Sequence, residues 1–238
     1  MAKIIVGNWK MHGSQTLVET LVPAVASFAA GSQSKSEIVL CPPAILLPLV
    51  AKQVQGSFLA VGGQDCNAKA EGAYTGDISA LMLAEAGCRY VIVGHSERRQ
   101  YYKELNETVK AKAEAAQAAG LIPIICVGEM LAQRESGLAM RYVTQQVREC
   151  VPAGGQFLLA YEPVWAIGSG KVPSATDIEQ MHQQILSLLP NAKVLYGGSV
   201  KAANAQEILH ISGVSGVLVG GASVNIEEFC GIIAAMGE

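Results

Sequence analysis

The carboxylate Glu162 ends the apolar run FLLAYE (157–162) and is followed at once by Pro163. Proline biases the residue before it towards extended geometry. A carboxylate on a rigid strand, covered by the apolar residues that follow it, would lose its water, and its pKa would rise towards that of a useful base. We therefore interpret Glu162 as a general base rather than as a solvated surface carboxylate.

A histidine takes a similar place at the end of another apolar run, YVIVGH (90–95). The segment that follows His95 is predicted to begin a helix, whose positive end disfavours imidazolium. A neutral ring could donate a hydrogen bond to a substrate carbonyl, and the residues alone favour this role and a structural role equally. The other histidines are interpreted as loop or surface residues without a role: His12, His182 and His210.

Two features could bind an anion. Lys10 follows the first apolar run and could supply a cation, although a snorkelling surface lysine is the alternative. The segments YGGS (196–199) and VGGAS (219–223) follow the last two apolar runs and precede helices. Glycines there leave backbone N–H groups that bind phosphate at a barrel mouth. Phosphate binding is therefore favoured over simple turns.

Eight short apolar runs must position these residues. They span 3–8, 37–42, 58–64, 90–95, 122–129, 157–162, 193–198 and 216–221. The runs are continuous rather than alternating, which is typical of parallel strands buried on both faces. Helical patterns separate them, including 14–31, 76–87, 106–120, 175–189 and 202–213, and Pro23 is expected to kink or shorten the first helix.

This alternation predicts a closed (β/α)8 barrel of eight parallel strands surrounded by helices, with the active site at the C-terminal ends of the strands. An open doubly wound sheet is the less favoured alternative, because the chain has no dinucleotide-binding fingerprint. Without a linker or low-complexity tract, residues 1–238 are expected to form one catalytic domain.

Composition excludes several classes of partner. The 238 residues are 50% hydrophobic and 16% charged, with a net charge of −3, so we expect no nucleic-acid or membrane partner. The N-terminus does not read as a signal peptide. Six cysteines without a C-x-x-C pair are interpreted as reduced thiols in a cytoplasmic protein rather than as a disulfide framework or a metal site.

Six motifs in order then point to a family. They are NWKM (8–11), GAYTG (72–76), GHSERR (94–99), AYEPVWAIGSGK (160–171), YGGSV (196–200) and VGGAS (219–223). In these segments the chain resembles the triosephosphate isomerase family. The resemblance implies interconversion of dihydroxyacetone phosphate and glyceraldehyde 3-phosphate through an enediolate, as in glycolysis and gluconeogenesis, without cofactor or metal.

The resemblance also implies a role for each catalytic residue. Glu162 would shuttle the proton between two carbons while neutral His95 polarises the carbonyl, a pairing already described for this family. Lys10 would offset the charge of the oxyanion and the phosphate. Asn8 would orient the substrate, and Glu97 would support Lys10.

The segment after Glu162 resembles the family's mobile lid. The lid residues would be Pro163, Val164, Trp165, Ala166, Ile167, Gly168, Ser169, Gly170 and Lys171. Phosphate would be bound by Asn8, Lys10, Gly168, Ser199, Gly220 and Gly221. Tyr196 and Ser199 would latch the closed lid, which excludes water and strengthens electrostatic stabilisation of the enediolate.

By the same resemblance the chain would be a homodimer, with a tetramer left open. Thr75, in the loop 64–79, would reach the partner's catalytic region, and Gln64 would lie at the interface. The usual family pattern is changed by His12 and Asp65, each in place of Asn, by Ser169 in place of Thr, and by Pro173 near the second hinge of the lid. Asp65 is expected to add a charge at the interface.

Two rival functions differ in what they require. An isomerase for another phosphorylated sugar would need a more open pocket than the short lid suggests. An inactive phosphate-binding scaffold predicts the loss of Lys10, His95 or Glu162, yet the sequence has all three.

Overall fold

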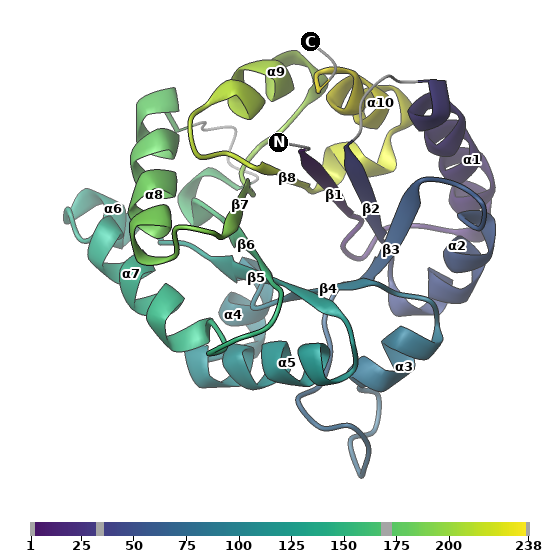
Figure 1. The fold of residues 1–238 in the computed structure, drawn as a ribbon, viewed down its shortest axis with the longest axis horizontal. Coiled ribbons are helices and arrows are strands. Elements are labelled where there is room, and N and C mark those ends of the chain that lie inside the picture. Colours follow the sequence, from purple (N-terminus) through teal and green to yellow (C-terminus); the bar gives the residue numbers. More distant parts are fainter. Residues whose placement is uncertain (1–2, 32–35, 168–172, 237–238) are drawn as a thin grey trace.

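Eight parallel strands close into one barrel in sequence order (Figure 1). The computed structural model describes residues 3–31, 36–167 and 173–236. The strands are β1 (Ile4–Asn8), β2 (Glu37–Cys41), β3 (Leu59–Gly63), β4 (Tyr90–Val93), β5 (Ile122–Val127), β6 (Leu158–Tyr161), β7 (Lys193–Tyr196) and β8 (Gly216–Val219). Because β1 pairs with both β2 and β8, the predicted barrel is confirmed and the open sheet is excluded.

Helices surround this barrel on its outer side (Figure 1). They are α1 (Gln15–Gly31), α2 (Leu47–Gln53), α3 (Ala80–Glu85), α4 (Ser96–Tyr102), α5 (Asn106–Ala118), α6 (Leu131–Glu135), α7 (Ala139–Cys150), α8 (Ala175–Leu188), α9 (Ala202–His210) and α10 (Ile226–Ala234). Short 3-10 helices span Ala44–Leu46 (η1), Val164–Ala166 (η2) and Gly221–Val224 (η3). Of the two effects expected of Pro23, shortening is excluded because α1 continues through it, and a kink stays a prediction.

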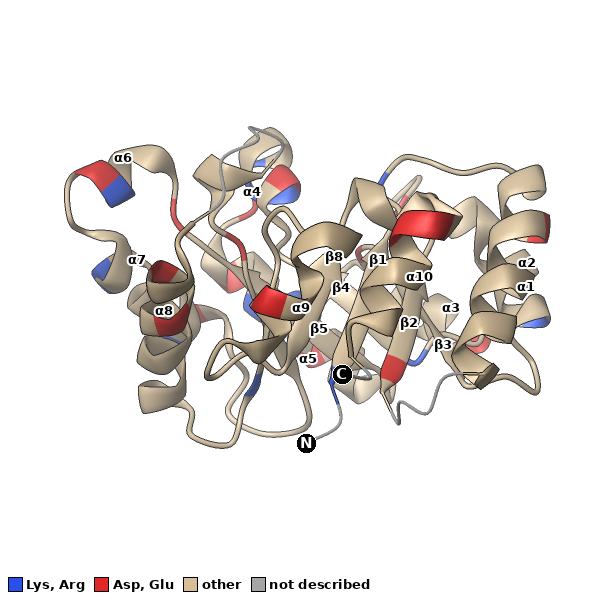
Figure 2. Ribbon diagram, turned by 90° about the horizontal axis from the view of Figure 1, so that it is seen from above, with Lys and Arg blue, Asp and Glu red and all other residues tan. Residues whose placement is uncertain are grey.

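Side chains alternate between two apolar layers, which explains the continuous apolar runs. Ile4 and Val6 of β1 point into the barrel interior, whereas Ile5 between them packs in the outer layer with the helices. In the side view, both termini lie at one end of the barrel, and α4 and α6 lie at the opposite end (Figure 2). The latter end carries the C-terminal ends of the strands.

His182 is buried, which corrects its assignment to the surface. Its ring packs edge-on against Tyr161, with centroids 5.9 Å apart, and Nδ1 lies 3.1 Å from the carbonyl oxygen of Gly213. Nε2 has no partner among the described residues. Burial lowers the pKa of His182 to about 4. The sequence held a signal, because His182 shares a helix face with the buried residues Ile178 and Ile185.

The six cysteines are free thiols. Among the described residues, no cluster of three or more His, Cys, Asp or Glu side chains could hold a metal ion. In the same part of the chain, no helix has the length and apolar character needed to cross a membrane.

Candidate active site

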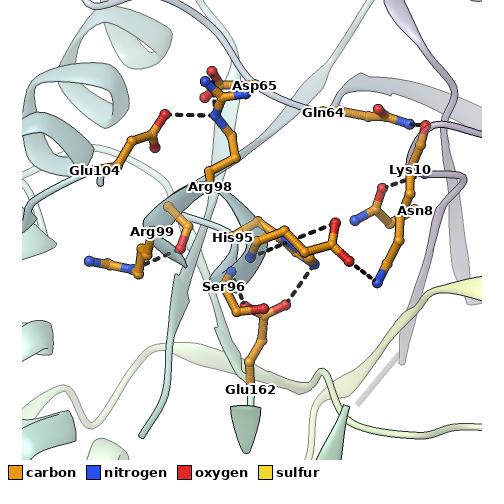
Figure 3. A network of polar contacts seen from close by, with 12 residues as sticks. Asn8, Lys10, Gln64, Asp65, His95, Ser96, Arg98, Arg99, Glu104 and Glu162 are labelled. Carbon is orange, nitrogen blue, oxygen red and sulfur yellow. Dashed lines mark hydrogen bonds and ion pairs between the residues drawn. The ribbon is translucent and has the colours of Figure 1, made fainter. Parts of the chain in front are cut away.

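The C-terminal ends of the strands bring distant residues to one cavity (Figure 3). Asn8 ends β1, His95 follows β4 and Glu162 follows β6, and all three line a cavity of about 370 Å³ together with Lys10. Ser199, Gly220 and Gly221 line the same cavity. The sequence-predicted acid, base, cation and glycine loops therefore meet in space.

Glu162 is held at both carboxylate oxygens and is only 2% exposed. Oε1 lies 3.0 Å from His95 Nε2, and Oε2 accepts a hydrogen bond of 2.8 Å from Ser96 N (Figure 3). The backbone of Glu162 is also held, because its N–H donates to the Val127 carbonyl oxygen at 2.8 Å. A Cβ at Gly128 would lie 1.7 Å from the Glu162 carbonyl oxygen, so only glycine allows this close approach.

The His95 ring has a definite hydrogen-bonding pattern. Its Nδ1 accepts a hydrogen bond from Glu97 N at 3.2 Å, at the start of α4. Only an unprotonated Nδ1 can accept this bond, so the proton of the neutral ring is on Nε2. That proton points towards Glu162. This hydrogen bond fits a neutral histidine with a donor facing the cavity, whereas the charge of Glu162 favours protonation of the ring, against the expected effect of the helix end.

The pKa of Glu162 differs from the sequence-based expectation. Burial raises the pKa of the carboxyl, but His95, the Ser96 N–H and Lys10 together outweigh burial and lower it. Burial lowers the pKa of His95, and the Glu162 carboxylate outweighs burial and raises it. A raised Glu162 pKa would follow from burial alone. It does not hold here because His95 Nε2 and the Ser96 N–H both donate to the carboxylate.

Lys10 adopts a left-handed backbone conformation, with φ of +53°, which is uncommon for a residue other than glycine. Two hydrogen bonds hold it there. Its N–H donates to Asn8 Oδ1 at 3.0 Å, and its carbonyl oxygen accepts from Gln64 Nε2 at 2.7 Å. Its Nζ lies 2.5 Å from Glu97 Oε1, which orients the ammonium group at the cavity. Gln64, predicted only as an interface residue, thus also supports Lys10.

The described part of the predicted lid, 163–167, contains η2, with Pro163 before it and Ile167 after it. Ser199 Oγ donates to the Ala166 carbonyl oxygen at 3.1 Å, as a latch would. The Tyr196 hydroxyl is buried without a partner among the described residues. The remaining predicted lid residues lie outside the described residues: Gly168, Ser169, Gly170 and Lys171.

Sequence reasoning missed Glu129, which is fully buried below this segment. Its Oε1 accepts hydrogen bonds from Trp165 Nε1 at 2.9 Å and from the Tyr161 hydroxyl at 3.1 Å. Burial raises its pKa despite these bonds. The signal was present, because Glu129 ends the apolar run 122–129 just as Glu162 ends its own.

The proposed interface residues lie on the loop 64–79, which projects from the barrel between β3 and α3 (Figure 1). Thr75 on this loop is exposed, and Gln64 at its base is half-buried. Asp65 does not add an unpaired charge, since its carboxylate lies 2.9 Å from Arg98 Nε (Figure 3) and 2.7 Å from Lys112 Nζ. His12 is exposed, and Pro173 is buried beside α8.

Comparison with known proteins identifies the family. The sequence profile described as triosephosphate isomerase matches residues 3–236. The triosephosphate isomerase of Afipia carboxidovorans is 46% identical over 98% of this chain and 96% of the relative. The chain belongs to the triosephosphate isomerase family. The triosephosphate isomerase of Caulobacter vibrioides is also 46% identical, again over 98% of this chain and 96% of the relative.

Structural comparison extends this result to the whole barrel. The crystal structure of triosephosphate isomerase from Bartonella henselae superposes with a TM-score of 0.92 at 37% identity and covers 100% of both chains. As a member of the triosephosphate isomerase family, the chain has Lys10, His95 and Glu162 around one cavity. An inactive scaffold would require the loss of at least one of these three residues, and all three are present.

Proposed function

We propose that the chain, as one catalytic domain, interconverts dihydroxyacetone phosphate and D-glyceraldehyde 3-phosphate. The observation that carries this proposal is the 3.0 Å approach of His95 Nε2 to Glu162 Oε1 in the cavity that Lys10 also lines. The names of the relatives, all triosephosphate isomerases, support the substrate. Turnover of glyceraldehyde 3-phosphate by the purified protein tests the proposal.

The proposed reaction moves one proton between adjacent carbons. The Glu162 carboxylate takes the proton from the carbon beside the carbonyl, while the His95 Nε2–H donates a hydrogen bond to the carbonyl oxygen. The resulting enediolate carries negative charge, which Lys10 offsets. Glu162 then returns the proton to the neighbouring carbon, while the hydroxyl proton passes from one enediolate oxygen to the other by way of His95 Nε2, so that no redox equivalent or cofactor is consumed. Asn8 orients the substrate, and Glu97 holds the Lys10 ammonium group, 2.5 Å away.

Phosphate binding is assigned to the glycine loops at the other side of the cavity. The backbone around Ser199, Gly220 and Gly221 supplies N–H donors, and Lys10 supplies the cation. The segment 163–171 acts as the lid, with Gly168 as a further phosphate ligand. Binding the phosphate and covering Glu162 are thereby joined in one segment, because the lid directly follows the base.

A homodimer is supported by several largely exposed apolar side chains. Met11 is 95% exposed, directly after Lys10, and Ile45 is 88% exposed after β2. Further exposed apolar residues lie on the loop 64–79, on α3, on α4 and between α4 and α5: Tyr74, Leu81, Met82, Tyr101, Tyr102 and Leu105. A second copy would cover them, with Thr75 reaching the partner's Lys10 region. Sedimentation of wild type and Thr75→Arg distinguishes monomer, dimer and tetramer.

The free thiols and the absence of a membrane-crossing helix among the described residues support a cytoplasmic location. Fractionation of cells that produce the protein tests this part of the proposal.

A further inference from the structure

Arg134 of the short helix α6 contacts Trp165 of the predicted lid and two carboxylates, one before and one after the lid in sequence. Its guanidinium carbon lies 5.5 Å from the centre of the Trp165 ring, and Nη1 lies 3.8 Å from Glu129 Oε1. Nη2 pairs with Asp177 Oδ1 in the first turn of α8. The side chain is 23% exposed, so it is a partly buried cation with three partners.

On one side of Arg134, Glu129 anchors the chain that leaves the catalytic base. The Trp165 indole N–H donates to Glu129 Oε1 at 2.9 Å, and the Val164 N–H donates to the Glu129 carbonyl oxygen at 3.1 Å. These two residues follow Glu162 by two and three positions. The position of Glu129 therefore affects the backbone that carries the base.

On the other side, Asp177 belongs to the N-terminal cap of α8. Its Oδ2 accepts hydrogen bonds from Ser174 Oγ at 2.7 Å and from Ser174 N at 3.2 Å, and its own N–H donates to Ser174 Oγ at 3.1 Å. The pairing with Arg134 therefore ties the start of α8 to α6. The planar guanidinium can meet Asp177 and Glu129 at the same time while it lies over the Trp165 ring, a geometry that a lysine ammonium cannot reproduce.

We propose that Arg134 is a positioning residue for Glu162. It orients the buried Glu129 carboxylate, which fixes Val164 and Trp165, and it joins this anchor to the start of α8 through Asp177. Arg134 does not line the cavity of the catalytic residues, so it acts on the base only through the chain that follows Glu162. The inference rests on the proposed function, because it assigns Glu162 as the base.

Steady-state kinetics of Arg134→Gln test the inference. A displaced base lowers kcat and leaves ground-state binding of the phosphate intact, so kcat falls about ten-fold or more while KM changes by less than about two-fold. Arg134→Lys restores less than half of the lost rate, because it keeps the charge but not the fork. The matched control is Arg141→Gln, an exposed arginine on α7, which leaves kcat at the wild-type value.

Two further measurements separate positioning from a structural role. Arg134 acts through Glu129, so combining Arg134→Gln with Glu129→Gln lowers kcat no further than the more damaging single change. In the Trp9→Phe background Trp165 is the only remaining tryptophan of the two in the chain, and its emission shifts in Arg134→Gln but not in Arg141→Gln. If Arg134→Gln does not fold, the same measurements on Arg134→Lys test whether Arg134 positions Glu162.

The outcomes separate this inference from the proposed function. An inactive wild type refutes the proposed function itself. An active wild type with unchanged kcat in Arg134→Gln, a rise in KM alone, multiplicative effects of the two changes, or unchanged Trp165 emission each refutes positioning by Arg134.

Discussion

Nε2 of His95 lies 3.0 Å from Oε1 of Glu162, and the second oxygen of Glu162 is held by the Ser96 N–H. The acid and the base of the proposed reaction are thus hydrogen-bonded to each other. A substrate carbonyl that accepts the hydrogen bond from His95 Nε2 would replace Glu162 as its acceptor. Glu162 would then lose one of the hydrogen bonds that lower its pKa. The base would therefore become stronger when the substrate binds, in the same step that engages His95.

This relationship predicts how Glu162 titrates in the free protein. Its carboxyl should titrate below the ordinary value of about 4.3 for Glu, because the donors outweigh burial and lower its pKa. Carboxyl ¹³C chemical shifts measured against pH, with Glu162→Gln for assignment, give this value. The His95→Gln variant is a second check, since loss of the histidine should raise the Glu162 pKa. A carboxyl that titrates above the ordinary value in the wild type would contradict the assignment.

The burial of His182 is expected to make the folded protein less stable in acid. Its folded pKa of about 4 is below its unfolded value of 6.5, so the unfolded chain binds the proton first as the pH falls. The contribution of neutral His182 to the free energy of unfolding is complete above about pH 6.5 and is lost as the pH falls from about 6.5 to about 4. At pH 5 about 2 kcal/mol of it has been lost. Gly213, the Tyr161 ring and the positive charge of Lys3 surround it and offer no acceptor for a second proton.

Urea unfolding of His182→Gln at pH 7.5 and pH 5 measures this contribution. The variant should lose about 2 kcal/mol less than the wild type between the two pH values. His210→Gln is the matched control, because His210 is exposed on α9. The same pH dependence in the wild type and His182→Gln would show that another group is responsible.

Lys112 and Lys110 of α5 offer a comparison of a buried and an exposed cation. Lys112 is 8% exposed and lies 2.7 Å from Asp65 and 2.6 Å from Glu104, whereas Lys110 is 42% exposed and 3.9 Å from Glu114. Lys112→Met removes a cation from two largely buried carboxylates and should cost about 3 kcal/mol of unfolding free energy. Lys110→Met should cost less than about 1 kcal/mol. Equal losses of unfolding free energy in the two variants, measured by chemical denaturation, would contradict a stabilising role for the pairing of Lys112 with Asp65 and Glu104.

Pro173 is predicted to affect the rate of lid movement without abolishing closure. It is buried directly before the cap of α8, and its fixed φ limits the freedom of the chain at this end of the lid. Relaxation dispersion at residues 163–167 should give different exchange rates in the wild type and Pro173→Ala. Pro190→Ala, at an exposed loop position, should behave as the wild type. Indistinguishable rates in all three proteins would remove the role of Pro173.

The barrel could be predicted from sequence because apolar runs and helical patterns alternate, and their local signals agree with the fold. The places of Glu162, His95 and Lys10 followed from their positions at strand ends. The direction of the Glu162 pKa shift could not be predicted, because it depends on Ser96 N–H and His95 in three dimensions. The burial of His182 could have been predicted from the helix face that it shares with Ile178 and Ile185, and the role of Glu129 from its place at a strand end.

Turnover of glyceraldehyde 3-phosphate by the wild type, Glu162→Asp and Glu162→Ala shows directly whether Glu162 is the base of this reaction. We expect fast wild-type turnover and a loss of about 10²–10⁴ or more in kcat in both variants, since Glu162→Asp withdraws the carboxylate and Glu162→Ala removes it. Melting temperatures of the three proteins confirm that the loss is not one of folding. An inactive wild type, or a folded Glu162→Ala variant that keeps the wild-type rate, would contradict the assignment of Glu162 as the base.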